Sequence, residues 1–182
     1  MEIVDRIFDG VLVVRGRTRV DGRGTMTVIC GSDFEEVGFR AAETRSYVMP
    51  RAGAFFGIHY RDESDPMIKV VTVIQGRGMD SVVDLRPQSP TYLQWKGVEL
   101  SADEALTLII PAGFGQTFLS LEEDTILMYS TDKTGKEGYS KTLNYQEPRI
   151  GLVLPAEVTE ISDYDREAPY LEEKTNGAGR AY

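Results

Sequence analysis

The side chains best suited to chemistry in this sequence are His59, Lys69 and Tyr129. His59 is the only histidine of the 182 residues and lies in the segment Gly57–Arg61. Lys69 interrupts an apolar segment at 68–74, where a buried lysine is rare without a partner. Tyr129 ends another apolar segment. A histidine, a lysine and a tyrosine on separate strands provide a general base, a cation and a weak acid. This set suits the removal of a proton next to a carbonyl group.

The same composition argues against the common metal sites. The chain has one histidine and one cysteine, Cys30, whereas zinc sites and other histidine-based metal centres need several such ligands. A site for a hard cation, built from one histidine and several carboxylates, stays open as an alternative. No Asp-x-Asp-x-Asp-Gly loop supports that alternative. We therefore predict a reaction without a metal and without a cofactor.

Short β-rich segments separated by turn residues dominate the chain and would have to position these side chains. Clusters of glycine, proline, aspartate and serine lie between the segments, as in Asp21–Gly24 and Pro87–Pro90. This pattern predicts an all-β sandwich or barrel. The predicted strands are 10–15, 25–30, 54–60, 68–75, 79–85, 91–100, 105–110, 116–121, 125–131 and 149–153.

Two short helices are predicted outside the strands. One lies near 33–42, where Ser32 or Asp33 would cap the first turn, and the other lies near 163–173, where Asp163 stands at the start. No internal repeat and no linker rich in glycine, proline or serine divides the chain. We therefore predict one domain over residues 1–172 and a mobile tail over residues 173–182.

Charge and composition limit the partners of the chain. The net charge is −9, from 29 acidic and 20 basic residues, which argues against a nucleic-acid partner. A few local arginines or lysines could still hold a phosphate in a pocket. No apolar segment approaches the roughly 20 residues of a membrane span, and Met1–Arg6 does not begin a signal peptide. A single cysteine excludes an internal disulfide and suits the cytoplasm.

Several short motifs, taken together and in order, resemble one enzyme family. The motifs are Asp21–Gly24, Gly57–Tyr60, Lys69, Val82–Arg86, Ser89–Thr91, Trp95, Leu100–Ser101, Ile110–Phe114 and Ser162–Asp165. They resemble those of the dTDP-4-dehydrorhamnose 3,5-epimerase family. Because the match runs in the right order from about residue 10 to about residue 172, it is more specific than any single motif.

The resemblance implies a jelly-roll cupin barrel that acts as a homodimer, without a metal, on a nucleotide-linked 4-keto-6-deoxy sugar. Position by position, His59 matches the general base and Asp165 its carboxylate partner. Lys69 matches the cation at the sugar ketone, Tyr129 the general acid on the opposite face, and Arg23 a contact on the nucleotide side. The ketone at C4 acidifies the protons on C3 and C5, so a base on one face and an acid on the other would invert a centre.

The chain also departs from the pattern of the family. Phe56 occupies the position of an arginine, and Gln116 replaces a second histidine. Gln116 could donate a hydrogen bond to a phosphate, so it is a candidate substrate contact, but it cannot carry a positive charge. Gly135 replaces an aromatic residue, and Met26 and Val28 follow the Asp-x-Arg-Gly motif in place of the usual aromatic and acidic residues. The predicted chemical centre is therefore retained, while several nucleotide-side positions differ.

Three alternatives follow from these departures. The enzyme could invert C3 alone, or it could act on a GDP- or CDP-linked sugar. A third alternative is a cupin that binds a sugar nucleotide without turnover. The presence of His59, Lys69 and Tyr129 speaks against the third alternative, because a pure binding module needs neither a base nor an acid.

Overall fold

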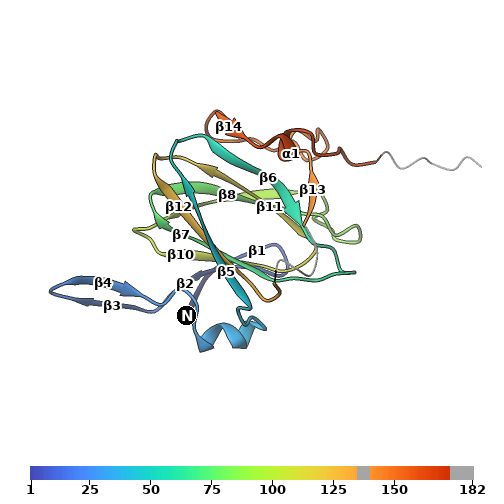
Figure 1. Cartoon of the computed structure of the whole chain (residues 1–182). Coiled ribbons are helices and arrows are strands. Elements are labelled where there is room, and N and C mark those ends of the chain that lie inside the picture. The colour runs from blue at the N-terminus through green and yellow to red at the C-terminus, as the bar shows by residue number, and fades with distance from the viewer. Residues whose placement is uncertain (135–139, 173–182) are drawn as a thin grey trace, which may run out of the picture.

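Two antiparallel β-sheets face each other and enclose the core of the chain (Figure 1). The computed structural model describes residues 1–134 and 140–172. The first sheet has the strand order β1 (Glu2–Ile7), β2 (Val11–Arg15), β10 (Leu106–Ile110), β7 (Lys69–Gln75), β12 (Thr125–Thr131) and β5 (Glu43–Met49). The second sheet has the order β13 (Lys141–Leu143), β6 (Ala54–Tyr60), β11 (Phe114–Ser120), β8 (Arg77–Asp84) and β9 (Trp95–Ser101), and β14 (Glu160–Ile161) pairs with β6. The predicted all-β jelly roll is confirmed.

The main core lies between the two sheets, and side chains alternate in and out of it along each strand. Val71 and Val73 of β7 point into this core, as do Leu108 and Ile110 of β10. Phe118 of β11 meets them from the second sheet and is fully buried. Burial of apolar surface stabilises the fold by about 25 cal/mol per Å², and this interior fixes which residues of each strand face the space between the sheets.

The outer face of the first sheet is covered as well, which explains why its central strands read as continuous apolar runs. Val70 and Ile109 point away from the main core and pack against Phe34 and Phe39. Both phenylalanines belong to the segment around the 3₁₀ helix η1 (Ser32–Val37). A strand with both faces buried loses the simple alternation of polar and apolar residues.

Most predicted strands are confirmed, with specific differences. The predictions agree with β2, β6, β7, β8, β10, β11 and β12. The strand expected at 91–100 begins only at Trp95, because the preceding residues form a turn in which Leu93 has a φ of 66°. The strand expected at 25–30 is the shorter β4 (Gly24–Thr27). The sequence does not predict β1, β3 (Thr18–Asp21), β5, β13 or β14.

The strand predicted at 149–153 is wrong. The backbone N–H groups of Ile150 and Gly151 both donate to the carbonyl of Glu147, and Gly151 has a φ of 61°. These contacts form a turn and leave no strand ladder. Ile150 is nevertheless buried, because it packs against the outer face of the second sheet with Ile58.

The two predicted helices are shorter than expected. The region at 33–42 forms only η1, which begins after Gly31 and ends at Gly38 with a φ of 78°. No side-chain cap is present there, so the assignment of Ser32 or Asp33 as the cap is wrong. The region at 163–173 forms only α1 (Asp163–Arg166). Within the described residues, no helix is long and apolar enough to cross a membrane.

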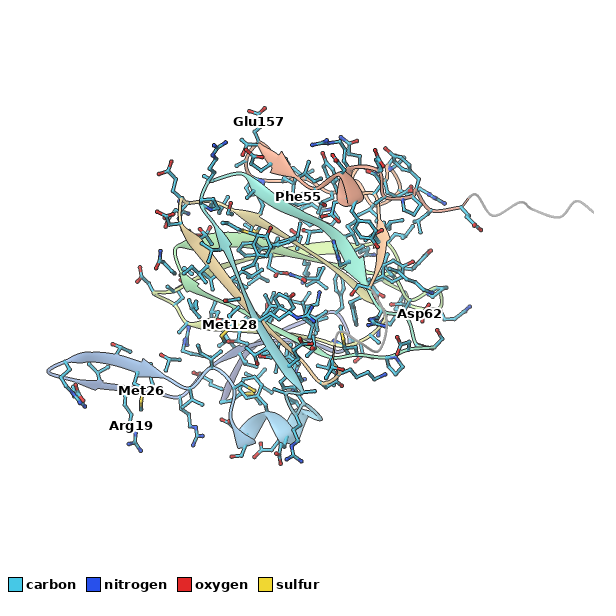
Figure 2. All side chains as sticks on the ribbon, viewed as in Figure 1. Arg19, Met26, Phe55, Asp62, Met128 and Glu157 are labelled. Carbon is cyan, nitrogen blue, oxygen red and sulfur yellow. The ribbon has the colours of Figure 1, made fainter. Side chains whose placement is uncertain are left out.

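A small hairpin, formed by β3 and β4, projects from the two-sheet body (Figure 1). Within residues 1–134 and 140–172, its strands pair only with each other. Arg19 and Met26 lie on the arm (Figure 2), and Val20 and Met26 are 77% and 58% exposed. The predicted tail at 173–182 lies outside the described residues.

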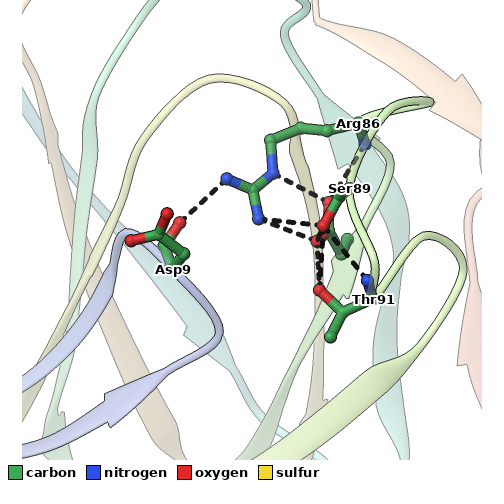
Figure 3. A network of polar contacts seen from close by, with 5 residues as sticks. Asp9, Arg86, Ser89 and Thr91 are labelled. Atoms are coloured by element: carbon green, nitrogen blue, oxygen red, sulfur yellow. Dashed lines mark hydrogen bonds and ion pairs between the residues drawn. The ribbon is translucent and has the colours of Figure 1, made fainter.

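Asp84 is a fully buried carboxylate at the end of β8 that holds the following loop in place. The loop residues around it, Arg86, Ser89 and Thr91, are labelled in Figure 3. The guanidinium of Arg86 donates to both carboxylate oxygens of Asp84, at 2.9 and 2.8 Å, and the hydroxyls of Ser89 and Thr91 each donate to Oδ2 at 2.6 Å. Arg86 also donates to the backbone carbonyl of Asp9 at 2.9 Å. Burial alone would raise the pKa of Asp84, but these hydrogen bonds outweigh it and hold the pKa below its ordinary value.

We expect Asp84→Ala to lower the free energy of unfolding by about 3 kcal/mol, because it leaves a half-buried guanidinium without its partner. Urea denaturation at neutral pH measures this loss. The folded pKa of Asp84 is lowered, so its stabilising contribution is complete above the unfolded pKa of about 4 and is lost as the pH falls below it. The difference between wild type and variant should therefore narrow in acid. Asp103→Ala, in an exposed turn, is the control and should change stability little; an equal loss in both variants would contradict this account.

Candidate active site

A pocket with a volume of about 420 Å³ opens between the two sheets. The first sheet contributes Lys69, Val71 and Tyr129 to its wall, and the second contributes His59 and Gln116. The structure therefore brings together five positions from four strands, β6, β7, β11 and β12. Four of them are side chains that the sequence analysis singled out as catalytic or substrate-binding candidates.

His59 is held by a buried carboxylate. It lies on β6 with 26% of its side chain exposed, and its Nε2 lies 2.6 Å from Oδ1 of Asp165, whose side chain is 4% exposed. Because a carboxylate only accepts hydrogen bonds, Nε2 carries the hydrogen and Nδ1 presents its lone pair. His59 and Asp165 therefore have the arrangement of a general base and the carboxylate that orients it.

Asp165 is fixed by its own local structure. It lies in the first turn of α1, where the hydroxyl of Ser162 donates to Oδ2 at 3.0 Å and accepts from the Asp165 backbone N–H at 3.1 Å. Burial would raise the pKa of Asp165, but hydrogen bonds with His59 and Ser162 keep it below its ordinary value. Gly57 permits this approach, since a Cβ at that position would lie 3.0 Å from Cβ of Asp165.

Lys69 enters the pocket from the start of β7 and donates from Nζ to Oε1 of Gln116 at 2.9 Å. Burial lowers the pKa of Lys69 to about 8, opposed by the negative charge of Asp80 and assisted by the positive charge of Arg61. The amine therefore remains largely protonated at neutral pH. It supplies a positive charge in a partly dry cavity, where such a charge acts strongly.

Tyr129 lines the pocket from β12, in the sheet that faces the strand of His59. Arg45 of β5 pairs with Tyr129 in the ladder and forms a side-chain hydrogen bond with it. This hydrogen bond and the contacts of Arg45 with Glu43 raise the pKa of Arg45. The tyrosine hydroxyl therefore has a fixed cationic neighbour.

The sequence analysis missed three lining residues because it missed strand β5. Glu43, Arg45 and Tyr47 alternate along this strand and all line the pocket. Their period of two was the available signal, but polar residues on both faces hid it. The ring of Tyr47 meets that of Phe56 edge to face at 4.7 Å, so Phe56, which stands where the family has an arginine, forms part of an aromatic wall.

The pocket is basic although the chain is acidic. Among the described residues that line it, the basic side chains are Arg45, Arg61, Lys69 and Lys133, and the only carboxylate is Glu43. Such a local excess of positive charge favours an anion against the net charge of −9. A phosphorylated ligand would therefore be attracted to this cavity.

The structure does not bring Arg23 to the pocket of its own chain. Arg23 lies at the tip of the β3–β4 hairpin, with 91% of its side chain exposed, and pairs with Asp21 at 2.7 Å. It is absent from the described lining of the pocket. Its predicted contact with a nucleotide would require a second chain.

No group of three or more histidine, cysteine, aspartate or glutamate side chains that could hold a metal is found within residues 1–134 and 140–172. The arrangement around His59 is instead one of proton-transfer groups. The imidazole of His59 and the phenol of Tyr129 line the cavity from different sheets, and the ammonium of Lys69 lies in the same wall as the tyrosine. Chemically, this arrangement can take a proton from one face of a bound carbon and return one to the other face.

Comparison with known proteins points to one family. The family profile of dTDP-4-dehydrorhamnose 3,5-epimerase matches residues 6–173. The dTDP-4-dehydrorhamnose 3,5-epimerase of Methanothermobacter thermautotrophicus is 32% identical over 164 residues, which is 87% of this chain and 88% of that protein. A dTDP-4-dehydro-6-deoxyglucose 3-epimerase of a Streptomyces species is 34% identical over 120 residues, which is 65% of this chain and 61% of that protein.

A solved structure agrees with these relatives. The crystal structure of a dTDP-4-dehydrorhamnose 3,5-epimerase from Bacillus anthracis, with TDP and pyrophosphate bound, superposes with a TM-score of 0.86 at 28% identity. The match covers 93% of this chain and 99% of that chain. The likeness therefore extends over the whole two-sheet body.

Proposed function

This chain belongs to the dTDP-4-dehydrorhamnose 3,5-epimerase family, and we propose that it inverts carbon centres beside the C4 ketone of a nucleotide-linked 4-keto-6-deoxy sugar through His59, Lys69 and Tyr129. It is an epimerase, an isomerase that acts on a sugar nucleotide. The observation that carries the proposed roles is the placement of His59 and Tyr129 on facing sheets around one pocket. Inversion needs a base and an acid on opposite sides of the same carbon.

Proton transfer in this site would begin at Nδ1 of His59. The base takes the proton next to the ketone, and the electrons of that C–H bond form an enolate whose negative charge lies on the C4 oxygen. Asp165, 2.6 Å from Nε2, stabilises the imidazolium, and the ammonium of Lys69 stabilises the enolate oxygen. The hydroxyl of Tyr129 then gives a proton to the opposite face of the carbon. Exchange with water restores both groups, so the net reaction is an isomerisation.

The nucleotide would be held mainly by charge. Arg61 and Lys133 line the pocket beside Lys69, which suits a diphosphate. Phe56 replaces the arginine of the family pattern and packs against Tyr47, so this part of the wall offers stacking area in place of a charged contact. We therefore expect weaker selectivity for dTDP than the family pattern implies, and GDP- or CDP-linked sugars remain alternative substrates.

We also propose that the enzyme is a cytoplasmic homodimer. The β3–β4 hairpin pairs with no other strand in the described part of the chain and carries the exposed apolar side chains of Val20 and Met26. A second copy would cover these side chains, because a free apolar arm is costly in water. The same packing could bring Arg23 to the nucleotide of the other chain. The cytoplasmic location is proposed because the single cysteine, Cys30, cannot form a disulfide within the chain, as is usual for proteins of a reducing compartment.

Solvent deuterium incorporation tests the function. We expect the enzyme to place deuterium at C3, at C5 or at both, when 4-keto-6-deoxy sugars linked to dTDP, UDP, GDP or CDP are offered in D₂O with EDTA present. The position of the label separates a C3-only enzyme from a double epimerase, and the panel ranks the nucleotides. Binding of any of these compounds without label incorporation would favour the non-catalytic cupin instead.

A further inference from the structure

Asp80 is a buried carboxylate that the reaction described above does not use. It lies on β8 and is 0% exposed. Its Oδ2 accepts from Nε2 of Gln116 at 2.6 Å, while no partner for Oδ1 is found within the described part of the chain. An incompletely paired buried carboxylate costs stability, so its presence beside the pocket calls for an explanation other than stability.

The Gln116 amide joins Asp80 to Lys69 in a fixed direction. Lys69 can only donate, and it donates to Oε1 at 2.9 Å. An ionised Asp80 can only accept, and it accepts from Nε2 at 2.6 Å. The amide therefore has one favourable orientation, with its oxygen toward the pocket, because the reversed amide would oppose both neighbours. The glutamine side chain does not titrate, so the net charge of this group of three residues depends on Lys69 and Asp80 alone.

The hydrogen bonds that join Asp80, Gln116 and Lys69 lie in the wall of the active-site pocket. Gln116 lies directly opposite His59 in the β6–β11 ladder, and Lys69 reaches it from the other sheet. The other charged or titratable groups that line the pocket with Lys69 are His59, Arg61, Tyr129, Lys133, Tyr164, and Glu43, Arg45 and Tyr47 of β5. Of the two neighbouring charges that shift the pKa of Lys69, that of Asp80 favours the protonated form and that of Arg61 opposes it.

We propose that Asp80 is a positioning residue that, through the amide of Gln116, fixes both the direction and the charge of the Lys69 ammonium. This assignment rests on the proposed function only for the role of Lys69 in turnover. Burial raises the pKa of Asp80 to about 7 and lowers that of Lys69 to about 8. The carboxylate of Asp80 and the ammonium of Lys69 are therefore both charged over a narrow pH range around neutrality.

Direct titration of Lys69 tests the proposal without any substrate. Protein labelled with ¹³C at the lysine ε-carbon is titrated by NMR, and the Lys69 signal is assigned by its loss in Lys69→Met. We expect a midpoint near 8 in the wild type and a midpoint lower by about one pH unit in Asp80→Asn, because removal of the negative charge disfavours the ammonium. An unchanged midpoint in folded Asp80→Asn would overturn the proposal.

Two further variants keep the test decisive. Gln116→Met removes the bridging amide at nearly constant volume, so the midpoint should fall there too; if Asp80→Asn does not fold, this variant decides. Thr117→Val is the matched control, because Thr117 is the buried neighbour of Gln116 on β11 and its Oγ1 has no partner among the described residues. Its midpoint should equal that of the wild type, and an equal fall in Thr117→Val would overturn the assignment to Asp80. Because the titration measures no turnover, its result is independent of whether the chain catalyses the proposed epimerisation.

Discussion

Replacement of His59 by asparagine is expected to abolish the exchange of the sugar's C3 and C5 protons with solvent. The imidazole lines the pocket and has a buried carboxylate 2.6 Å from Nε2, which leaves Nδ1 of the neutral ring as the proton acceptor. A positioned base contributes about 10² to 10⁴ in rate, and exchange requires this base even when no inversion follows. We therefore expect the exchange rate, followed by ¹H NMR in D₂O, to fall by about 10² to 10⁴, with the loss in kcat/KM.

The fold and a neighbouring ring provide the control for this experiment. His59→Asn should keep the circular dichroism spectrum of the wild type, because the imidazole is partly exposed in the pocket wall and belongs to none of the hydrophobic core clusters of the described residues. Tyr164→Phe alters a largely exposed ring whose centroid lies 6.2 Å from that of His59. It should retain most of the exchange. Normal exchange in His59→Asn would exclude the mechanism proposed for this pocket.

Local sequence motifs predicted the strands that carry His59, Lys69 and Tyr129 because those strands are apolar and bounded by turns. Their meeting in one pocket follows from the pairing of strands far apart in the chain, which periodicity alone does not encode; the family resemblance supplied it. Strand β5 escaped prediction because it lies at a sheet edge and lines a polar pocket, so its residues do not alternate between apolar and polar. The polar residues that β5 needs in the pocket wall remove the alternation by which a strand is recognised in a sequence.

Other differences have equally local causes. The helix expected at 33–42 stops after the six residues of η1 because Gly38 takes a left-handed conformation. Asp80 was not singled out, since an aspartate in a strand reads as a solvent-facing residue until its strand is known to be central. The placement of Arg23 on a projecting arm could not be read from its turn motif, which fixes the hairpin but not its direction.

Replacement of Tyr129 by phenylalanine is expected to separate exchange from inversion. The hydroxyl lies in the wall opposite the strand of His59 and forms a hydrogen bond with Arg45, so its loss removes the acid on one face and leaves the base on the other. His59 can still take a proton and return a deuteron to the same face. Label incorporation with retained configuration should therefore persist, while inversion should fall by about 10² to 10⁴.

The measurement for this variant follows both quantities in one sample. Deuterium at C3 and C5 is read by mass spectrometry, and configuration is read by chromatographic comparison of the reduced sugar with standards of known configuration. Tyr47→Phe is the matched control, because it removes a hydroxyl from another tyrosine of the same pocket and should leave the ratio of inversion to exchange unchanged. If exchange and inversion fell together in Tyr129→Phe, the tyrosine would act in substrate binding or in proton removal by His59, and not as the proton donor on the opposite face. If neither fell, the proton donor would have to be another group, and the facing sheets would not explain the stereochemistry.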